Sequence, residues 1–185
     1  ATQELVERGR YLANAGHCAG CHTPRGGAAY AGGLGIGTPF GTIYSSNLTP
    51  DTTHGIGSWS VDHFWRAMHN GRSKEGHLLY PAFPYPSFTK LTREDSDALY
   101  AYLRTVPASN QPDTPHALRF PYNTQLALAV WRALSFKPGV FEKNETKPPE
   151  WNRGAYLVEG AGHCIACHGA RNSLGATQDQ RGLSG

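Results

Sequence analysis

The four cysteines of this chain all lie in two copies of one short motif, Cys-x-x-Cys-His. The copies occupy residues 18–22 and residues 164–168. This motif is the signature of covalently attached c-type haem, because two thiols at this spacing form thioethers with one porphyrin and the adjacent imidazole binds its iron. The sequence therefore predicts two covalently bound c-type haems. The predicted thioether residues and proximal iron ligands are Cys18, Cys21, Cys164, Cys167, His22 and His168.

Zinc sites and redox disulfides are the two alternative uses of paired cysteines. The cysteine pairs of a zinc ribbon usually lie about 15–20 residues apart, whereas 142 residues separate Cys21 from Cys164. The flanks of the motif also repeat: Arg-Gly-x-Tyr-Leu precedes it at residues 8–12 and 153–157, and Gly-His stands directly before each first cysteine. This repetition favours a duplicated haem-binding unit over zinc or a disulfide.

Composition limits the class of protein but does not indicate a function. The 185 residues are 39% hydrophobic, enough for ordinary cores, and no stretch approaches the roughly 20 apolar residues that span a bilayer. The formal charge of +3 is largely offset by two haem propionates per haem, so it gives no reason to expect nucleic acid as a partner. The first residues, from Ala1, show neither a basic nor a hydrophobic leader region, so we expect any export signal to have been removed or to lie outside this sequence. Because haem attachment to this motif normally follows export, we expect a bacterial periplasmic location.

Apolar spacing predicts a small helical domain over residues 1–106. Helices are expected over residues 2–15, from an N-cap at Ser60 to a stop at Gly71, and from a cap at Thr92 to Arg104. Tyr11 is expected on the apolar stripe of the first helix. A glycine-rich loop over residues 23–57 and a proline-rich loop over 81–86 separate these helices. Helix, haem motif, long loop, helix, proline-rich loop and helix is the order of a class I cytochrome c domain.

The remaining chain divides into a linker and the start of a second unit. Residues 107–150 carry seven prolines and one helical pattern, over 125–136 after a cap at Asn123, which we expect to pack between the units. Its expected apolar positions are Leu126, Val130, Ala133 and Leu134. Residues 151–185 form the N-terminal part of a second cytochrome c domain. The predicted fold class is therefore all-α: a class I cytochrome c domain, a linker with one helix and a truncated second domain.

Four further segments carry a resemblance to a known family. They are SNLTPD (46–51), GIGSWS (55–60), LYPAFPY (79–85) and EWNRGAYLV (150–158). With these segments the chain resembles the multihaem cytochrome c subunits of bacterial membrane-associated alcohol, gluconate and aldehyde-type dehydrogenases. The resemblance implies that electrons pass from a catalytic dehydrogenase subunit through the haems to quinone or to a terminal oxidase or cytochrome. Three haem domains follow one another in that family.

The second unit is much shorter than the first. The first unit extends about 84 residues past His22, whereas 17 residues follow His168. We therefore expect either a fragment of a longer polypeptide or a second chain that completes the site, with the second haem exposed. Membrane association through a C-terminal region absent from this chain is left open by the sequence, as is the distal ligand of the second haem.

The sixth ligand of the first haem has several candidates. Many members of the resembling family have Met where this chain has Phe83, and phenylalanine cannot bind iron. Met68 is the only methionine, and we expect it to be the distal ligand on the helix that covers the haem. The alternatives are a purely structural Met68, bis-histidine coordination through His69 or His77, and an open iron.

Residues around the haem are predicted less directly. By loop position, Arg25, Asn47 and Thr49 are candidate donors to haem propionates. His17 and His163 stand beside the cysteines but point the wrong way to bind iron, so we expect them at the surface or in support of the haem. Aromatic side chains, led by Trp59, Trp65, Tyr80 and Tyr85, are candidates to line the pocket.

Three functions fit these observations. The first is a non-catalytic electron-transfer subunit, because the chain lacks a Ser-His-Asp set, a phosphate loop and a nicotinamide fingerprint. The second is a dihaem enzyme, peroxidase-like or thiosulfate-oxidising, which needs an open iron. The third is a haem-based ligand sensor. Binding of carbon monoxide separates the first function from the other two.

Overall fold

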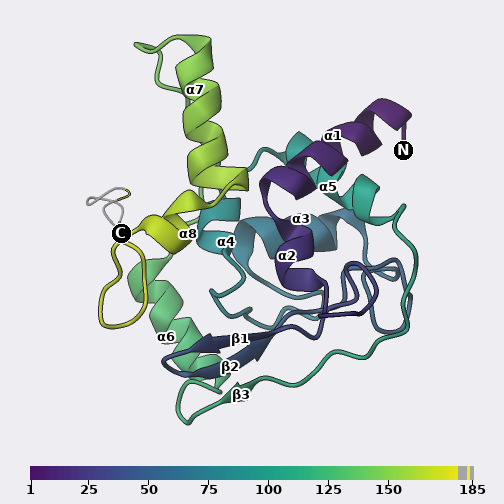
Figure 1. The fold of residues 1–185 in the computed structure, drawn as a ribbon. Helices are drawn as coiled ribbons and strands as arrows, with labels where there is room; N and C mark the ends of the chain where they lie inside the picture. Colours follow the sequence, from purple (N-terminus) through teal and green to yellow (C-terminus); the bar gives the residue numbers. More distant parts are fainter. Residues whose placement is uncertain (179–182, 184–185) are drawn as a thin grey trace.

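The computed structural model describes residues 1–178 and residue 183 as a helical protein with one small sheet (Figure 1). Its helices surround the first haem motif, and the second motif lies against them. The elements in chain order are α1 (Gln3–Ala15), α2 (Cys18–His22), β1 (Gly35–Thr38), β2 (Gly41–Tyr44), α3 (Val61–Asn70), α4 (Tyr85–Phe88), α5 (Arg93–Leu103), β3 (Ala117–Leu118), α6 (Gln125–Ser135), α7 (Pro149–Tyr156), the π-helical turn η1 (Leu157–Ala161) and α8 (Cys164–His168).

The crossing of α1 and α5 forms the centre of the fold. A Cβ on Gly9 would lie 1.9 Å from the carbonyl oxygen of Ala98, so only glycine allows the two helices to approach this closely. Leu12 of α1 and Leu99 and Leu103 of α5 are buried in the core beside this contact. Burial of such side chains contributes roughly 1.5–3 kcal/mol each to folding.

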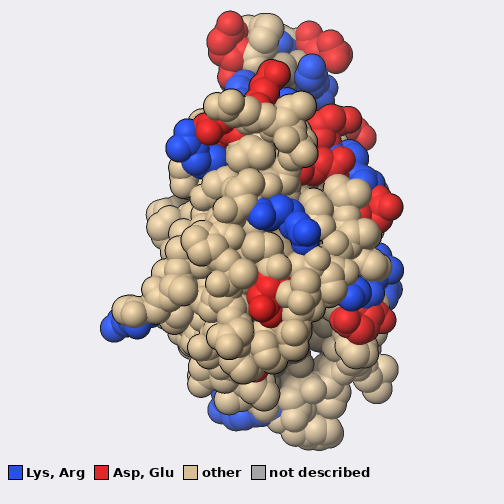
Figure 2. All heavy atoms as spheres, turned by 90° about the vertical axis from the view of Figure 1, so that its right-hand side faces the viewer, with Lys and Arg blue, Asp and Glu red and all other residues tan. Residues whose placement is uncertain are grey.

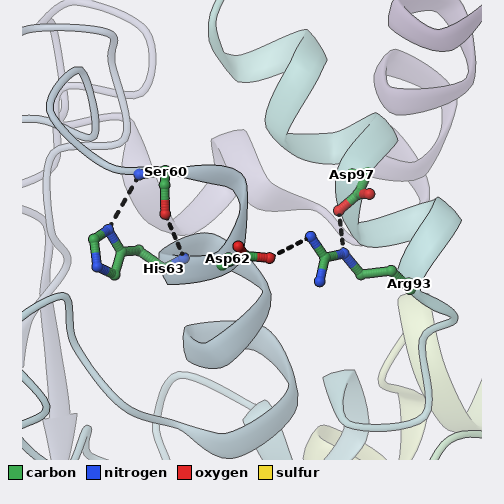
Figure 3. A network of polar contacts seen from close by, with 5 residues as sticks. All are labelled: Ser60, Asp62, His63, Arg93 and Asp97. Atoms are coloured by element: carbon green, nitrogen blue, oxygen red, sulfur yellow. Dashed lines mark hydrogen bonds and ion pairs between the residues drawn. The ribbon is translucent and has the colours of Figure 1, made fainter.

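Helix α3 confirms the predicted boundaries. The Ser60 hydroxyl accepts a hydrogen bond from the backbone N–H of His63, whose ring nitrogen accepts one from the backbone N–H of Ser60 (Figure 3). Gly71 ends the helix in the left-handed conformation, φ 58°. Arg93 of α5 joins this helix to α3 by pairing with Asp62 at 2.6 Å. It also pairs with Asp97 of its own helix at 2.7 Å.

The segment expected to be a loop over residues 23–57 contains a β-hairpin. Strand β1 pairs antiparallel with β2, and β2 also pairs with β3 from residues 117–118. The prediction of an all-α fold is therefore right only for the helices. Strands of four residues or fewer, two of them starting with glycine, carry too little hydrophobic alternation to be recognised from sequence.

Residues 107–116 lie on the first unit. The Asn47 side chain donates to the carbonyl oxygens of Ser109 and Gln111 at 2.8 and 2.9 Å. The backbone N–H of Asn47 donates to Asp113 at 2.8 Å, and burial raises the pKa of that carboxyl group. Asn47 is itself buried, so this segment covers a polar cluster and is part of the domain surface.

Helix α6 turns its predicted apolar face outward. Leu126, Val130 and Leu134 are 76%, 53% and 71% exposed, while Leu128 is 5% exposed. Hydrogen bonds from two side chains attach the helix to the rest of the protein. The Gln125 side chain bonds to the backbone of residue 78, and Trp131 Nε1 donates to the carbonyl oxygen of residue 174. The N-cap is Thr124, not Asn123.

The second unit docks on α5 through a buried polar network. The Tyr156 hydroxyl donates to Asp95 Oδ2 at 2.5 Å and accepts from the backbone N–H of Thr92 at 3.0 Å. Arg8 of α1 pairs with the other oxygen of Asp95 at 2.5 Å. The repeat equivalent of Tyr156 is Tyr11, which is exposed, so its expected place on the apolar stripe of α1 is wrong.

The surface carries charges of both signs. On the face seen in Figure 2, acidic and basic side chains are interspersed with uncharged atoms, without a large area of one sign. Among the described residues, every helix falls short of the length and apolar character needed to cross a bilayer.

Candidate haem sites

The two haem motifs adopt the same local conformation. Each forms a five-residue helix, α2 or α8, and each is preceded by a histidine in the left-handed region. The φ angles are 51° for His17 and 39° for His163. The duplication found in the sequence is therefore also present in the backbone.

The imidazole of His22 is oriented for binding a metal ion. Its Nδ1 lies 2.7 Å from the carbonyl oxygen of Ser46. Because a carbonyl oxygen only accepts, Nδ1 carries the proton and Nε2 keeps its lone pair, which is the usual arrangement of a metal-binding histidine. Burial lowers the pKa of His22, although the hydrogen bond to Ser46 opposes this shift.

The cysteine side chains are free thiols. Burial raises the pKa of Cys18 to about 12, and it also raises the pKa of Cys21, with a smaller contribution from the nearby Cys167. In the part of the chain that the structure describes, no three His, Cys, Asp or Glu side chains gather as a metal site would require. Although Cys21 lies near Cys167, the described side chains thus do not form the compact four-cysteine set of a zinc site.

Met68 is the most buried of the candidate distal ligands. It lies on α3, is 5% exposed, and belongs to the same apolar cluster against which Cys18 and Phe83 pack. His69 is engaged elsewhere: its ring stacks on Trp65 at 4.5 Å and its Nδ1 contacts the carbonyl oxygen of Thr89 at 3.1 Å. His77 is exposed. Burial beside the thiol of the first motif favours Met68 for the distal position.

The expected propionate contacts are not supported for two of the three residues. The side chains of Asn47 and Thr49 bond to each other and to residue 109, and both are buried within the protein. Their polar groups are therefore occupied in holding the 107–113 segment. Arg25 is exposed on the loop after the first motif.

The aromatic candidates divide into core and surface positions. Tyr85 is fully buried, with its ring 4.9 Å from that of Phe136, and burial raises its pKa. Trp59, Trp65 and Tyr80 are half-buried. Tyr85 packs as a core residue, while the half-buried rings lie nearer the protein surface.

The second motif is more open than the first. Cys164 is half-buried, whereas Cys167 and His168 are exposed. The described residues after it return to helix α6, where Trp131 donates to the carbonyl oxygen of Leu174 at 2.9 Å. The expected exposure of the second haem itself stays a prediction.

Comparison with known proteins now decides the family. The family model described as Cytochrome c matches residues 6–107, more than half of the chain. The chain belongs to the cytochrome c family. This membership confirms the resemblance found in the sequence and implies covalently attached haem in the cytochrome.

Similar proteins include named dehydrogenase subunits. The cytochrome is 50% identical to a nicotinate dehydrogenase subunit of Pseudomonas putida over 93% of this chain and 14% of that protein. It is 46% identical to the gluconate 2-dehydrogenase cytochrome c subunit of Pantoea cypripedii over 100% of this chain and 42% of that protein. It is 40% identical to a diheme cytochrome c-type protein of Cereibacter sphaeroides over 97% of this chain and 62% of that protein. The chain thus spans less than two thirds of each relative.

Two residues at the site of this cytochrome were not singled out as functional from the sequence. Ser46 orients His22 through a backbone carbonyl, which any residue type supplies, so no sequence signal exists for it. His163 was expected only at the surface or in a supporting place, yet its ring reaches the first haem motif. The repetition of Gly-His before both cysteine pairs is the one sequence signal that points to it.

Proposed function

We propose that this cytochrome carries electrons from a catalytic dehydrogenase subunit to quinone or another respiratory acceptor, through two covalently bound haems. One observation supports the proposal above the others: both Cys-x-x-Cys-His motifs form the same short helix with free thiols. The names of the relatives, cytochrome c subunits of gluconate and alcohol dehydrogenases, support the choice of partner.

Each protein group has a distinct part in this proposal. Haem supplies a one-electron couple between ferrous and ferric iron. Cys18 and Cys21 would hold the first porphyrin, and His22, whose Nδ1 is fixed by the Ser46 carbonyl oxygen, would bind the iron through Nε2. Met68 is the proposed distal ligand, and a thioether there raises the reduction potential relative to a second imidazole. The apolar cluster around Met68 excludes water from this side.

The proposal extends to organisation and location. We assign residues 1–106 to the first cytochrome domain, 107–150 to a connecting region and 151–185 to the start of a second domain. A periplasmic location follows from the chemistry, since haem attachment to this motif is normally completed after export. The catalytic subunit would perform the substrate chemistry, and this chain would hold and pass electrons.

Haem stoichiometry tests the cofactor assignment. The intact mass of the protein should exceed the chain mass by two haems. The double variant Cys18→Ala/Cys21→Ala and the double variant Cys164→Ala/Cys167→Ala should each retain one haem. A mass increase of one haem in the wild type, unaffected by the second pair of substitutions, would reject the two-haem assignment.

Carbon monoxide then tests the carrier function. A six-coordinate ferrous haem in the first unit should bind carbon monoxide slowly, as measured in the Cys164→Ala/Cys167→Ala variant, where the second haem does not interfere. Fast and complete binding in that variant would instead favour the enzyme or sensor functions. Reduction of the protein by a purified dehydrogenase partner is the direct measurement of the proposed activity.

A further inference from the structure

The segments directly before the two haem motifs of this cytochrome are in contact. His163, directly before Cys164, places its Nε2 3.0 Å from the carbonyl oxygen of Gly16, two residues before Cys18. The backbones are also close there, since a Cβ on Gly16 would lie 2.9 Å from the carbonyl oxygen of Ala161. One hydrogen bond thus joins residues 147 positions apart in the sequence, immediately beside both thioether sites.

The ring of His163 is held firmly in this position. Its backbone adopts a left-handed conformation, with φ 39°. The ring meets the edge of Phe88 at 5.4 Å with an interplanar angle of 88°. Because the Gly16 carbonyl oxygen only accepts, Nε2 is the donor, and this bond sets the tautomer of the ring. His163 therefore has one arrangement, defined by both units.

The equivalent residue of the first motif has no such role. His17 also precedes its cysteine in a left-handed conformation, but its side chain is exposed. Within the described residues, no hydrogen bond from the His17 ring reaches the second unit. The contact is thus a feature of His163 and not a general consequence of the motif.

We propose that His163 is a positioning residue that fixes the separation and orientation of the two haems, and so sets the rate at which they exchange electrons. This inference rests on the proposed two-haem function. In the exchange one electron leaves the ferrous iron of one haem and reduces the ferric iron of the other, with no bond made or broken. Such a rate falls steeply with distance, and the hydrogen bond ties both attachment points to one carbonyl.

The test uses the holoprotein and compares His163→Leu with His163→Gln, His163→Asn and His17→Leu. After laser-flash reduction by a flavin semiquinone, redistribution between the haems is followed as a phase independent of protein concentration. His163→Leu should slow this phase measurably, by up to the roughly two- to tenfold change in the docking equilibrium constant that loss of one hydrogen bond produces. His163→Gln, whose amide reaches the place of Nε2, should stay within about twofold of the wild type, as should His17→Leu.

The outcomes separate this inference from the proposed function. If His163→Leu retains both haems and the wild-type exchange rate, the positioning role is wrong while the two-haem carrier stands. A wild type with a single haem would overturn both. If His163→Leu loses the second haem, the two amide variants provide the test. Electron exchange between the haems should then be slower in His163→Asn, whose side chain is shorter, than in His163→Gln. Equal exchange rates in these two variants would overturn the inference.

Discussion

At the scale of single residues, two histidines in or beside the haem motifs are each oriented by a backbone carbonyl from elsewhere in the chain. The Ser46 carbonyl oxygen fixes the tautomer of His22, and the Gly16 carbonyl oxygen fixes that of His163. Backbone carbonyls make both contacts. Because every residue type supplies a backbone carbonyl, such contacts cannot be predicted from residue identity. The chemical groups of the site could therefore be predicted from the sequence, but the orientation of the histidine rings could not.

The Met68→Leu variant tests the distal ligand. The oxidised wild type should show the far-red charge-transfer band of sulfur bound to ferric iron, and the variant should lack it. Leucine has a similar volume, so packing changes should cost less than about 1.5 kcal/mol of unfolding free energy. Phe64→Leu, on the same buried face of α3, is the control and should keep the band. A band that survives in Met68→Leu, or is absent from the wild type, assigns the distal position to another group.

Tyr156 should contribute to alkaline unfolding. Burial, and then its hydrogen bond to Asp95, raise its pKa to about 12, above the ordinary value near 10. The fold thus favours the protonated phenol, and this stability is fully present below about pH 10 and is lost as the pH rises toward 12. Tyr156→Phe should flatten that slope and destabilise the protein by about 1.5–3 kcal/mol, because the buried Asp95 carboxylate loses a donor.

The control for this prediction is the repeat equivalent. Tyr11 is exposed, so Tyr11→Phe should change the unfolding free energy by less than about 0.5 kcal/mol. Chemical denaturation of the holoprotein between pH 8 and about 12 measures both variants. Some slope should remain in Tyr156→Phe, since burial also raises the pKa of Tyr30. Identical pH profiles for the two variants would contradict the role of Tyr156.

At the scale of elements, the two repeats use equivalent helices differently. Helix α1 crosses α5 at Gly9 in backbone contact, whereas the equivalent Gly154 on α7 has no atom near its ideal Cβ position among the described residues. The Tyr156 hydroxyl, at the end of α7, instead bonds to α5 through Asp95. Repeated sequence therefore builds repeated local structure, but the packing partner of each copy differs.

The two glycines give a matched pair of variants. Gly9→Ala should destabilise the protein by about 1–3 kcal/mol, because its Cβ meets the Ala98 carbonyl at 1.9 Å and the helices must separate. Gly154→Ala should be neutral or stabilising by up to about 1 kcal/mol, the helix propensity of alanine over glycine. Thermal and denaturant unfolding of the holoprotein give both values. Equal changes in unfolding free energy at the two positions would show that the close α1–α5 contact does not require glycine at position 9.

At the scale of the whole molecule, segments expected to connect units are part of the packed structure. Residues 107–116 cover the Asn47 cluster, residues 117–118 add a strand to the hairpin, and α6 contacts the segment after the second haem motif. These contacts hold the second haem motif near the first, and the bond from His163 to Gly16 adds a contact directly beside the two motifs. On the face seen in Figure 2, acidic and basic side chains are interspersed.

Release of the 107–116 segment should be detectable by proteolysis. Asn47→Ala removes two donors to the segment and leaves the backbone N–H of the buried Thr49 without its acceptor, at a cost of about 1–3 kcal/mol. Proteinase K should then cut within residues 107–116 faster than in the wild type, as measured from fragment masses. Asn110→Ala, at an exposed position of the same segment, is the control and should be cut at the wild-type rate. Unchanged cutting in Asn47→Ala would mean that other contacts hold the segment.

The sequence by itself determined what depends on neighbours a few residues apart. The haem motifs, the Ser60 cap and Gly71 stop of α3, and the helical pattern of α5 all rest on local spacing, so they could be predicted. Family membership followed from such segments too.

The tertiary structure decided everything that joins distant residues. It placed His163 on Gly16, turned the leucines of α6 to solvent, paired β2 with β3 and closed the 107–116 segment over Asn47. Each depends on packing and hydrogen bonding between residues far apart in the chain, often through backbone groups that every residue shares. Periodicity reports that a helix has an apolar face, but only the assembled fold decides what that face meets.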